Sequence, residues 1–584
     1  MIADLVFLAF GISALIGAFW KSGGYLGTLV SAVLFVLLEF NPGSVLTYFV
    51  LIAGIVWVVV SIYSVSYAKE YGKWLSSLLP LMIMGMSLIL VSRNYLEIIS
   101  GWEIMSVSGY AIVALNKKEY GPAFTFMVFS EFSTILLVSG AAYAYFTTGT
   151  LNFTAVNSYV PLLLISLGSL IKMGMTPFMI SEWLPIAHGN APANASAVLS
   201  ATMTLMGVFF IMKMVLLSPL TAPIGYLFLA IGAISILFAS IYAYISENMK
   251  MLAGFSTIEN NAAILAAIGL YIIASSSTLR EFVLLTIIIF SLSHAISKTG
   301  LFMSIGNSKG EFFGENNHPT TSTQRVGTMI TAMSLSGLFP TIGGLATWML
   351  LEAFFMEAYF GGTTGITAIV IGSVIAMGEG MATGSMMKIL AFGNIFNRAV
   401  SRKHESGHLV LTGTGVLIIA LFAGAMLFFP SAFLAGLPSI LIYNGFMITS
   451  AFGPADFGLV SPDYIIILIT VFSTLAYLAF GKPKTRDVPV WNGGAVELDP
   501  YTSYAYSNNI RLMLRRVLRT RTDVSGHSPT VVDVFWLIMN DIGKGYRALS
   551  KLFTLKIMNS SISWYMIYMI LAFMVVLVVT AATF

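Results

Sequence analysis

The chain has 584 residues, of which 57% are hydrophobic and 9% are charged, and its mean hydropathy is +0.89. Soluble domains carry about a quarter charged residues, so this composition excludes a soluble globular protein and indicates a polytopic membrane protein. The formal net charge of +4 is small and is spread over loops, which argues against a nucleic-acid partner. Cysteine is absent, which excludes disulfides, thiol catalysis and cysteine-ligated iron–sulfur clusters.

Apolar runs follow one another along most of the chain. The first, "MIADLVFLAFGISALIGAFW", lacks a basic start, so we interpret it as a spanning helix and not as a cleaved signal. A run of roughly 20 residues crosses about 30 Å of hydrocarbon, and about sixteen runs meet that length approximately. We expect them near residues 2–19, 24–39, 47–66, 76–93, 96–115, 122–146, 160–180, 191–215, 223–245, 257–275, 281–305, 326–357, 364–393, 408–429, 462–480 and 560–583.

Basic residues are concentrated in alternate loops. One set of loops carries Lys21, Lys69, Lys73, Lys117, Lys118, Lys250, Lys309, Arg325, Arg398, Arg402, Lys403 and the residues from Lys482 onward. The other set has little beyond Arg93 and Arg280. Because cytoplasmic loops are enriched in Lys and Arg, the first set is predicted to be cytoplasmic, with both termini outside a cell membrane.

Two prolines interrupt spans at corresponding positions. Pro177 falls in the seventh predicted span and Pro340 in the twelfth. Broken helices in corresponding positions are typical of transporters built from inverted repeats, so we expect an all-α fold with two inverted five-helix repeats. The predicted organisation is 1–75 N-terminal helices, 76–215 first repeat, 223–393 second repeat, 394–480 additional helices, 481–559 cytoplasmic segment and 560–584 last helix.

The predicted cytoplasmic segment 481–559 has two parts. The first is polar and basic, with Arg511, Arg515, Arg516, Arg519 and Arg521. The second places apolar residues on one helical stripe: Val532, Phe535, Trp536, Met539, Ile542, Tyr546, Leu549 and Phe553. This pattern fits a lateral helix on the membrane surface or on neighbouring subunits, and it fits an ordinary amphipathic packing helix equally well.

Few ionisable residues fall inside the predicted spans. A charge at bilayer depth costs about 2.5–3.5 kcal/mol on insertion scales, so each one is a candidate functional residue. They are Glu103, Glu131, Lys172, Lys213, His294, Lys298, Glu379 and Lys388. The six histidines form no Cys/His cluster, and we expect no metal site and no cofactor.

His294 and Lys298 stand four residues apart and therefore share one helical face. A histidine exchanges protons near neutral pH, and a desolvated lysine beside a carboxylate has two nearly balanced protonation states. This combination is suited to a proton relay. Lys213 lies near a helix end, where its side chain can snorkel to the interface. Glu131 fits a structural hydrogen bond and a relay position equally well.

The order of several motifs resembles a known family. These are "WEIMSVSGY", "IKMGMTPFMISEWLPIAHGNAPANASAVLSA", "MKMLAGFSTIEN", "SHAISKTGLF", "SLSGLFPTIGG" and "MMKILAFGNIF". Together they resemble the antiporter-like subunits of complex I and of multi-subunit sodium/proton antiporters. "STIEN", "VPVWNGG" and "YTSYAYSNNIRLML" look most similar to the hydrogenase-4 component B group, which includes formate hydrogenlyase and archaeal membrane-bound hydrogenases.

The resemblance implies roles for particular residues. Glu103 corresponds to the family's glutamate in the fifth helix, Lys172 to the lysine beside the broken seventh helix, and His294 and Lys298 to the relay of the eleventh. It also implies that Pro177 lets the helix bend and admit water to Lys172.

Two positions depart from the family's pattern. The lysine of the eighth helix falls on Leu205, and the Lys or Glu after the twelfth-helix break falls near Thr347. Glu352, Glu379 and Lys388 are the residues available to substitute.

These features predict an ion-translocating subunit of a respiratory-type oxidoreductase complex, moving H⁺ or exchanging H⁺ with Na⁺. The alternative is a transport-inactive scaffold that braces its neighbours with the lateral helix. The resemblance implies other antiporter-like membrane subunits as partners, and peripheral subunits of the hydrogenase or NADH dehydrogenase type that carry the iron–sulfur clusters. The chain itself would perform no redox chemistry.

Overall fold

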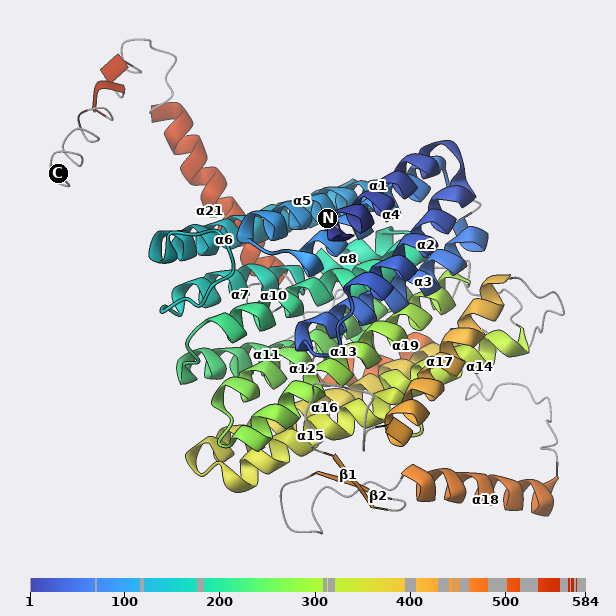
Figure 1. The fold of residues 1–584 in the computed structure, drawn as a ribbon. Coiled ribbons are helices and arrows are strands. Elements are labelled where there is room, and N and C mark those ends of the chain that lie inside the picture. Colours follow the sequence, from blue (N-terminus) through green and yellow to red (C-terminus); the bar gives the residue numbers. More distant parts are fainter. Residues whose placement is uncertain are drawn as a thin grey trace. The chain divides into compact units, whose positions relative to one another are not determined.

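Helices make up nearly all of the chain that the structure describes (Figure 1). The structure is a computed structural model, and it divides the chain into two compact units, Met1–Leu512 and Met513–Phe584. The described residues are 2–68, 71–115, 120–175, 183–307, 312–313, 321–393, 406–428, 441–444, 447–450, 462–481, 502–514, 534–556 and, within 566–574, all but 568, 572 and 573.

The helices agree closely with the predicted spans. In chain order they are α1 (Ile2–Phe19), α2 (Lys21–Glu39), η1 (Val45–Thr47), α3 (Tyr48–Tyr67), α4 (Lys73–Val91), α5 (Tyr95–Ala114), α6 (Gly121–Thr148), α7 (Val160–Lys172), α8 (Trp183–Asn190), α9 (Ala193–Val198), the π-helical η3 (Leu199–Met203), α10 (Thr204–Leu217), α11 (Ala222–Ile245), α12 (Met249–Ile273), α13 (Ser277–Gly306), α14 (Ser322–Leu335), α15 (Ile342–Phe360), α16 (Thr363–Phe392), α17 (Ser406–Phe428), α18 (Pro462–Phe480), α19 (Ser503–Met513) and α21 (Val534–Lys556). Side-chain caps fix several starts, as where Asn248 accepts hydrogen bonds from the N–H groups of Lys250 and Met251.

Nine of the described helical stretches are long and apolar enough to cross a membrane, and four shorter apolar helices accompany them. The protein is therefore an integral membrane protein, while the count of sixteen spans stays a prediction. The expected all-α fold is confirmed, and β1 (Leu441–Asn444) and β2 (Met447–Ser450) add one short antiparallel hairpin to it. Two four-residue strands fit in the connection after α17, where the sequence analysis expected no regular element.

The second unit contains α21, which coincides with the predicted amphipathic stripe. Of its described side chains, those of Tyr546, Leu549 and Leu552 are exposed within the unit. Whether this helix lies on a membrane or on a partner stays a prediction.

The seventh predicted span is broken after Lys172. Gly174 adopts a left-handed φ of 76°, its N–H donates to Ile171 O, and the N–H of Met175 donates to Leu170 O, both at 3.0 Å. These bonds form a Schellman cap, which ends a helix at a glycine. The end of α7 therefore lies before Pro177, which is outside the described residues.

The span near 326–357 is broken by the same kind of cap. Gly337 has a φ of 64°, its N–H donates to Ser334 O at 3.2 Å, and Leu338 N–H donates to Met333 O at 3.0 Å. The chain then passes Pro340 and re-enters a helix at α15, which Thr341 caps through the N–H of Gly344. The predicted break at Pro340 is thus present, and a glycine again ends the preceding helix.

The interior of the first unit is formed by α10, α12 and α13. Within 193–217, the most apolar 18-residue window is buried completely. The corresponding windows within 249–273 and within 277–306 are each 89% buried. In Figure 1 α12 and α13 run side by side among the other helices of the bundle. Glu259 on α12, and His294 and Lys298 on α13, are therefore surrounded by protein and not by lipid.

Candidate functional site

Lys172 is the last residue of α7, and its side chain is fully buried. Its Nζ donates hydrogen bonds to Ser106 Oγ on α5 and to Ser130 Oγ on α6, both at 2.8 Å. The Trp102 and Phe126 rings lie 5.8 and 5.3 Å from Nζ, so cation–π contacts cover the remaining directions. A lysine at a helix C-terminus also gains from the helix dipole.

Two carboxylates accompany Lys172. Glu103 on α5 and Glu131 on α6 are half-buried, and both interact electrostatically with the lysine. The hydroxyl of Thr134 donates a hydrogen bond to Glu103 Oε1. The structure therefore brings together three of the residues that the sequence singled out, and we refer to Glu103, Glu131 and Lys172 as the first cluster.

The broken end of α7 is held by side chains from elsewhere in the fold. Asn261 Nδ2 of α12 donates to Met173 O at 3.4 Å, and Trp183 Nε1 of α8 donates to Ile171 O at 3.0 Å. Backbone carbonyls freed inside a membrane must be satisfied by protein or water. These two bonds fix Lys172 beside α12, which carries the next ionisable residue.

Lys298 and His294 lie on one face of α13, as predicted, and both are buried. Lys298 Nζ donates to Ala253 O of α12 at 3.2 Å. It also interacts electrostatically with Glu259 of α12. The imidazole of His294 interacts with the backbone of Ser200 in the η3 segment.

Glu259 is a buried carboxylate that sequence reasoning missed, although it lies in the quoted motif "STIEN". Neither of its oxygens has a hydrogen-bond partner in the described part of the chain. It interacts with Lys298 and with Glu379 on α16. A Cβ at Gly378 would lie 3.7 Å from Glu259 Oε1, which shows that the carboxylate points at α16. We refer to Glu259, His294, Lys298 and Glu379 as the second cluster.

Glu379 faces the second helix break. Thr347 Oγ1 of α15 donates to Glu379 Oε2 at 3.3 Å. The position where the family carries a Lys or Glu therefore contacts a carboxylate from the neighbouring helix. Glu352 is also buried on α15.

Lys388 has a different environment from the other candidates. It lies near the C-terminal end of α16, where its Nζ is 3.0 Å from Glu247 Oε1 and donates to Ser507 Oγ at 3.2 Å. Arg511 of α19 binds the same Glu247 oxygen at 2.6 Å. Ser503 Oγ donates to Glu247 Oε2 at 2.5 Å. These contacts of Glu247 anchor α19 on α16 and on the α11–α12 turn. Lys388 is therefore ion-paired at a helix end.

Leu205, at the position where the resemblance implies a lysine, lies on α10 and is 1% exposed. A Cβ at the neighbouring Gly207 would touch Met173, so α10 packs directly on the end of α7. Ser200 and Thr257 share a hydrogen bond of 2.6 Å between the η3 segment and α12. The structure confirms close packing here, with an apolar side chain at the position of the family's lysine.

Lys213 lies outside both clusters. Its Nζ donates to Ser92 O at 2.7 Å and sits 3.8 Å from the centre of the Phe153 ring. Both partners are at helix ends or in loops, which agrees with a snorkelling lysine.

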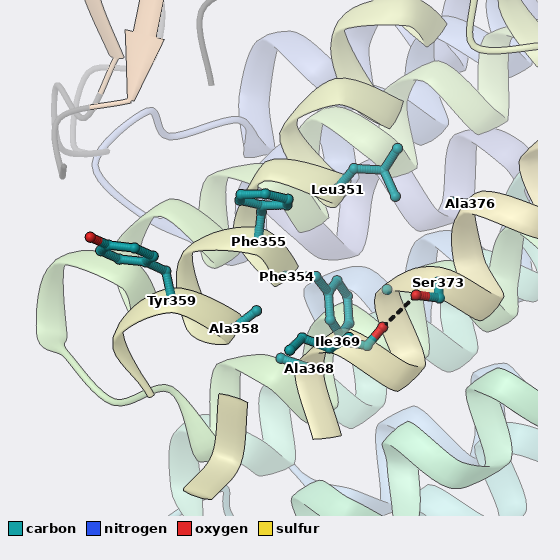
Figure 2. Close-up of a pocket in the computed structure, with 10 residues that line it drawn as sticks. Leu351, Phe354, Phe355, Ala358, Tyr359, Ala368, Ile369, Ser373 and Ala376 are labelled. Carbon is teal, nitrogen blue, oxygen red and sulfur yellow. Dashed lines mark hydrogen bonds between the residues drawn. The ribbon is translucent and has the colours of Figure 1, made fainter. Parts of the chain in front are cut away.

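A groove of about 570 Å³ between α15 and α16 contains none of the candidate residues. Figure 2 shows Phe354, Phe355 and Ile369 lining it, with the Ser373 hydroxyl turned back to donate to Ile369 O at 2.8 Å. Its lining is apolar and suits hydrocarbon, so it offers no path for an ion.

The comparisons with known proteins agree with this geometry. Residues 92–376 match the family model described as NADH:quinone oxidoreductase/Mrp antiporter, transmembrane. Hydrogenase-4 component B of Escherichia coli (strain K12) is 31% identical over 290 residues, which cover 46% of this chain and 43% of that protein. The match therefore spans less than half of that relative.

Two solved structures share the fold. The membrane-bound sulfane sulfur reductase, an archaeal respiratory membrane complex, contains a chain with a TM-score of 0.78 and 16% identity, covering 98% of this chain and 99% of that one. A chain of the Mrp complex from Dietzia sp. DQ12-45-1b has a TM-score of 0.72 and 16% identity, covering 100% of this chain and 63% of that one. The resemblance indicated by the motifs is confirmed: residues 92–376, which carry both clusters except for Glu379, match the model of the NADH:quinone oxidoreductase/Mrp antiporter transmembrane family.

Proposed function

We propose that this chain is the ion-translocating subunit of a respiratory-type membrane complex, in which redox reactions of partner subunits drive the movement of H⁺ or the exchange of H⁺ for Na⁺. The observation that carries the proposal is the environment of Lys172. Its partners are two serine hydroxyls, which accept hydrogen bonds from an ammonium group and can donate to a neutral amine. Both protonation states of Lys172 are therefore accommodated inside the protein.

The proposed route runs from the first cluster to the second. Glu103 and Glu131 interact electrostatically with Lys172, as Glu259 does with Lys298. A change of protonation in one cluster alters the electric field at the other cluster. In this way charge pairs can transmit a redox-driven signal along the subunit. Glu379 and Thr347 continue the route beyond Lys298, where the matching Schellman caps at Gly174 and Gly337 support the two predicted repeats.

The proposal also covers the partner subunits of this chain and its orientation in the membrane. The similar proteins are a hydrogenase component, a chain of a respiratory membrane complex and a chain of an Mrp complex. We propose that this chain sits beside other antiporter-like subunits, with its basic loops and α19 facing the cytoplasm and both termini outside.

The test compares the buried Lys172 with the half-buried Lys213 in the purified complex reconstituted into vesicles. Lys172→Met is expected to lower ion transport per electron transferred at least about tenfold, while electron transfer to an artificial acceptor persists. Lys213→Met is the matched control, because Lys213 is also a membrane lysine but contacts only Ser92 and aromatic rings. Equal transport by both variants would refute ion translocation by this chain and favour the scaffold alternative.

A further inference from the structure

His188 is a buried histidine that belongs to neither cluster. It lies on α8, the helix that follows the break after Lys172, and it is fully buried. Neither Nδ1 nor Nε2 has a hydrogen-bond partner among the described residues. A buried polar group that makes no hydrogen bond costs free energy, so its presence calls for an explanation.

The ring of His188 packs against α12 and α13, the two helices that carry Lys298 and the carbonyl that accepts its hydrogen bond. It packs on the Phe302 ring of α13 with centroids 4.8 Å apart, and Phe302 is one helical turn from Lys298. Its Cδ2 would lie 3.1 Å from a Cβ at Gly254, the neighbour of Ala253, whose carbonyl accepts the Lys298 hydrogen bond. Glycine at position 254 leaves room for the imidazole between α12 and α13.

On its other side His188 is next to residues that are partly exposed. Gly189 and Asn190 follow it directly, and Asn190 Nδ2 donates to Val113 O near the end of α5. Lys250 Nζ donates to Ala191 O at 3.0 Å, and Lys250 is half-buried at the start of α12. Both Lys298 and Lys250 interact electrostatically with the imidazole.

We propose that His188 is a proton-carrying residue that links Lys298 to the aqueous phase at the rim formed by Gly189, Asn190 and Lys250. This inference rests on the proposed function. A neutral imidazole accepts a proton from rim water on one ring nitrogen and releases its original proton from the other nitrogen to the neutral amine of Lys298. The imidazole ends as the other neutral tautomer, and the reverse transfer carries a proton out.

The position of His188 explains how Lys298 can exchange protons without the family's lysine at Leu205. Leu205 on α10 and Met173 at the end of α7 are buried side chains that cannot carry a proton, and α10 packs on the end of α7. A separate route from the rim to Lys298 would let the second cluster take up protons from the side of the membrane that carries the basic loops.

The experiment uses the purified complex in vesicles with three variants. His188→Phe keeps an aromatic ring against Phe302 and removes the proton carrier, so ion transport should fall at least about tenfold. His188→Ala should show the same loss, and millimolar 4-methylimidazole in the buffer should restore transport several-fold. Phe302→Leu, which keeps the histidine and disturbs only its packing, should transport within about twofold of the wild type.

The outcomes separate the inference from the proposed function. Wild-type transport by His188→Phe, together with loss in Lys172→Met, would overturn the role of His188 and leave the proposed function standing. An intact His188→Ala complex that 4-methylimidazole does not rescue would also overturn it. Rescue by the free imidazole supports it, whereas equal rescue by toluene, which fills the same cavity and carries no proton, would overturn it.

Discussion

The ammonium group of Lys388 lies 3.0 Å from Oε1 of Glu247, and that oxygen also accepts the Arg511 guanidinium at 2.6 Å. One carboxylate thus neutralises cations from two helices that are more than a hundred residues apart in sequence. All three side chains are largely buried, so the arrangement is sensitive to the loss of any member.

Removing Arg511 should release α19. Breaking a buried ion pair costs about 3–5 kcal/mol, which is enough to open a short surface helix part of the time. Since the chain has no cysteine, Ser507→Cys provides a single thiol at a buried position of α19. Maleimide labelling of that thiol should be at least about tenfold faster when Arg511→Gln is added. Asn509→Cys, on the exposed side of α19, should label at the same rate in both backgrounds, and an unchanged rate at Ser507→Cys would contradict the role of the ion pair.

Glu259 should be essential for transport but not for folding. Glu259→Gln keeps the shape of the side chain and removes the negative charge nearest to Lys298, so transport in vesicles is expected to fall at least about tenfold. Glu357→Gln is the matched control, because Glu357 is a buried glutamate that accepts hydrogen bonds from the N–H and hydroxyl of Ser275. That variant should lower the thermal unfolding midpoint and leave transport per assembled complex unchanged.

Ser106 and Ser130, which accept hydrogen bonds from Lys172, should have a cooperative effect on ion transport. A hydrogen bond to a charged group contributes about 1.5–3 kcal/mol, and either serine alone still leaves Nζ one partner. Ser106→Ala and Ser130→Ala should each reduce transport a few-fold, and the double variant should lose more than the product of the single effects. A double variant that transports like the single ones would show that the hydroxyls do not act on Lys172.

Gly174→Ala should destabilise the protein more than Gly149→Ala does. Both glycines adopt a left-handed φ, near 76° and 72°, so both alanines pay about 1–2 kcal/mol in backbone strain. At residue 174 the new Cβ would also come within 3.0 Å of Ile258, whereas nothing lies within 4 Å at residue 149. Unfolding midpoints in detergent measure the difference, and equal midpoints would argue against close packing at the end of α7.

The spans and the residues of the first cluster were predictable because they depend on local composition. Hydropathy locates helices such as α3 and α11 to within a few residues, and a lone Lys172 or Glu103 in an apolar run is conspicuous. The helix breaks were attributed to Pro177 and Pro340, but the caps at Gly174 and Gly337 end the helices in the structure. Glycine is common in membrane helices, so a single sequence does not show which glycines adopt the left-handed conformation that ends a helix.

Contacts between distant segments could not be predicted. The pairing of Lys388 with Glu247 and Arg511 requires α19 to return to the α11–α12 turn after more than a hundred intervening residues. Glu259 was overlooked although it falls inside the predicted span 257–275, where it is the third residue; α12 begins at Met249, which places the carboxylate well inside the helix. His188 was passed over because it lies in a Pro- and Gly-rich stretch that reads as a surface turn, and its burial comes from packing of α8 against α12 and α13.

The central position of α12 and α13 bears on how the protein is synthesised. These helices are joined by the short turn from Ala274 to Ser276, and each carries ionisable residues that a bare lipid environment would reject at about 2.5–3.5 kcal/mol apiece. If α12 and α13 leave the translocon together as a hairpin, the charge of Glu259 compensates that of Lys298. Neither helix is then exposed to lipid acyl chains by itself. Biogenesis would then couple the membrane insertion of these two segments, so deleting one should trap the other outside the bilayer.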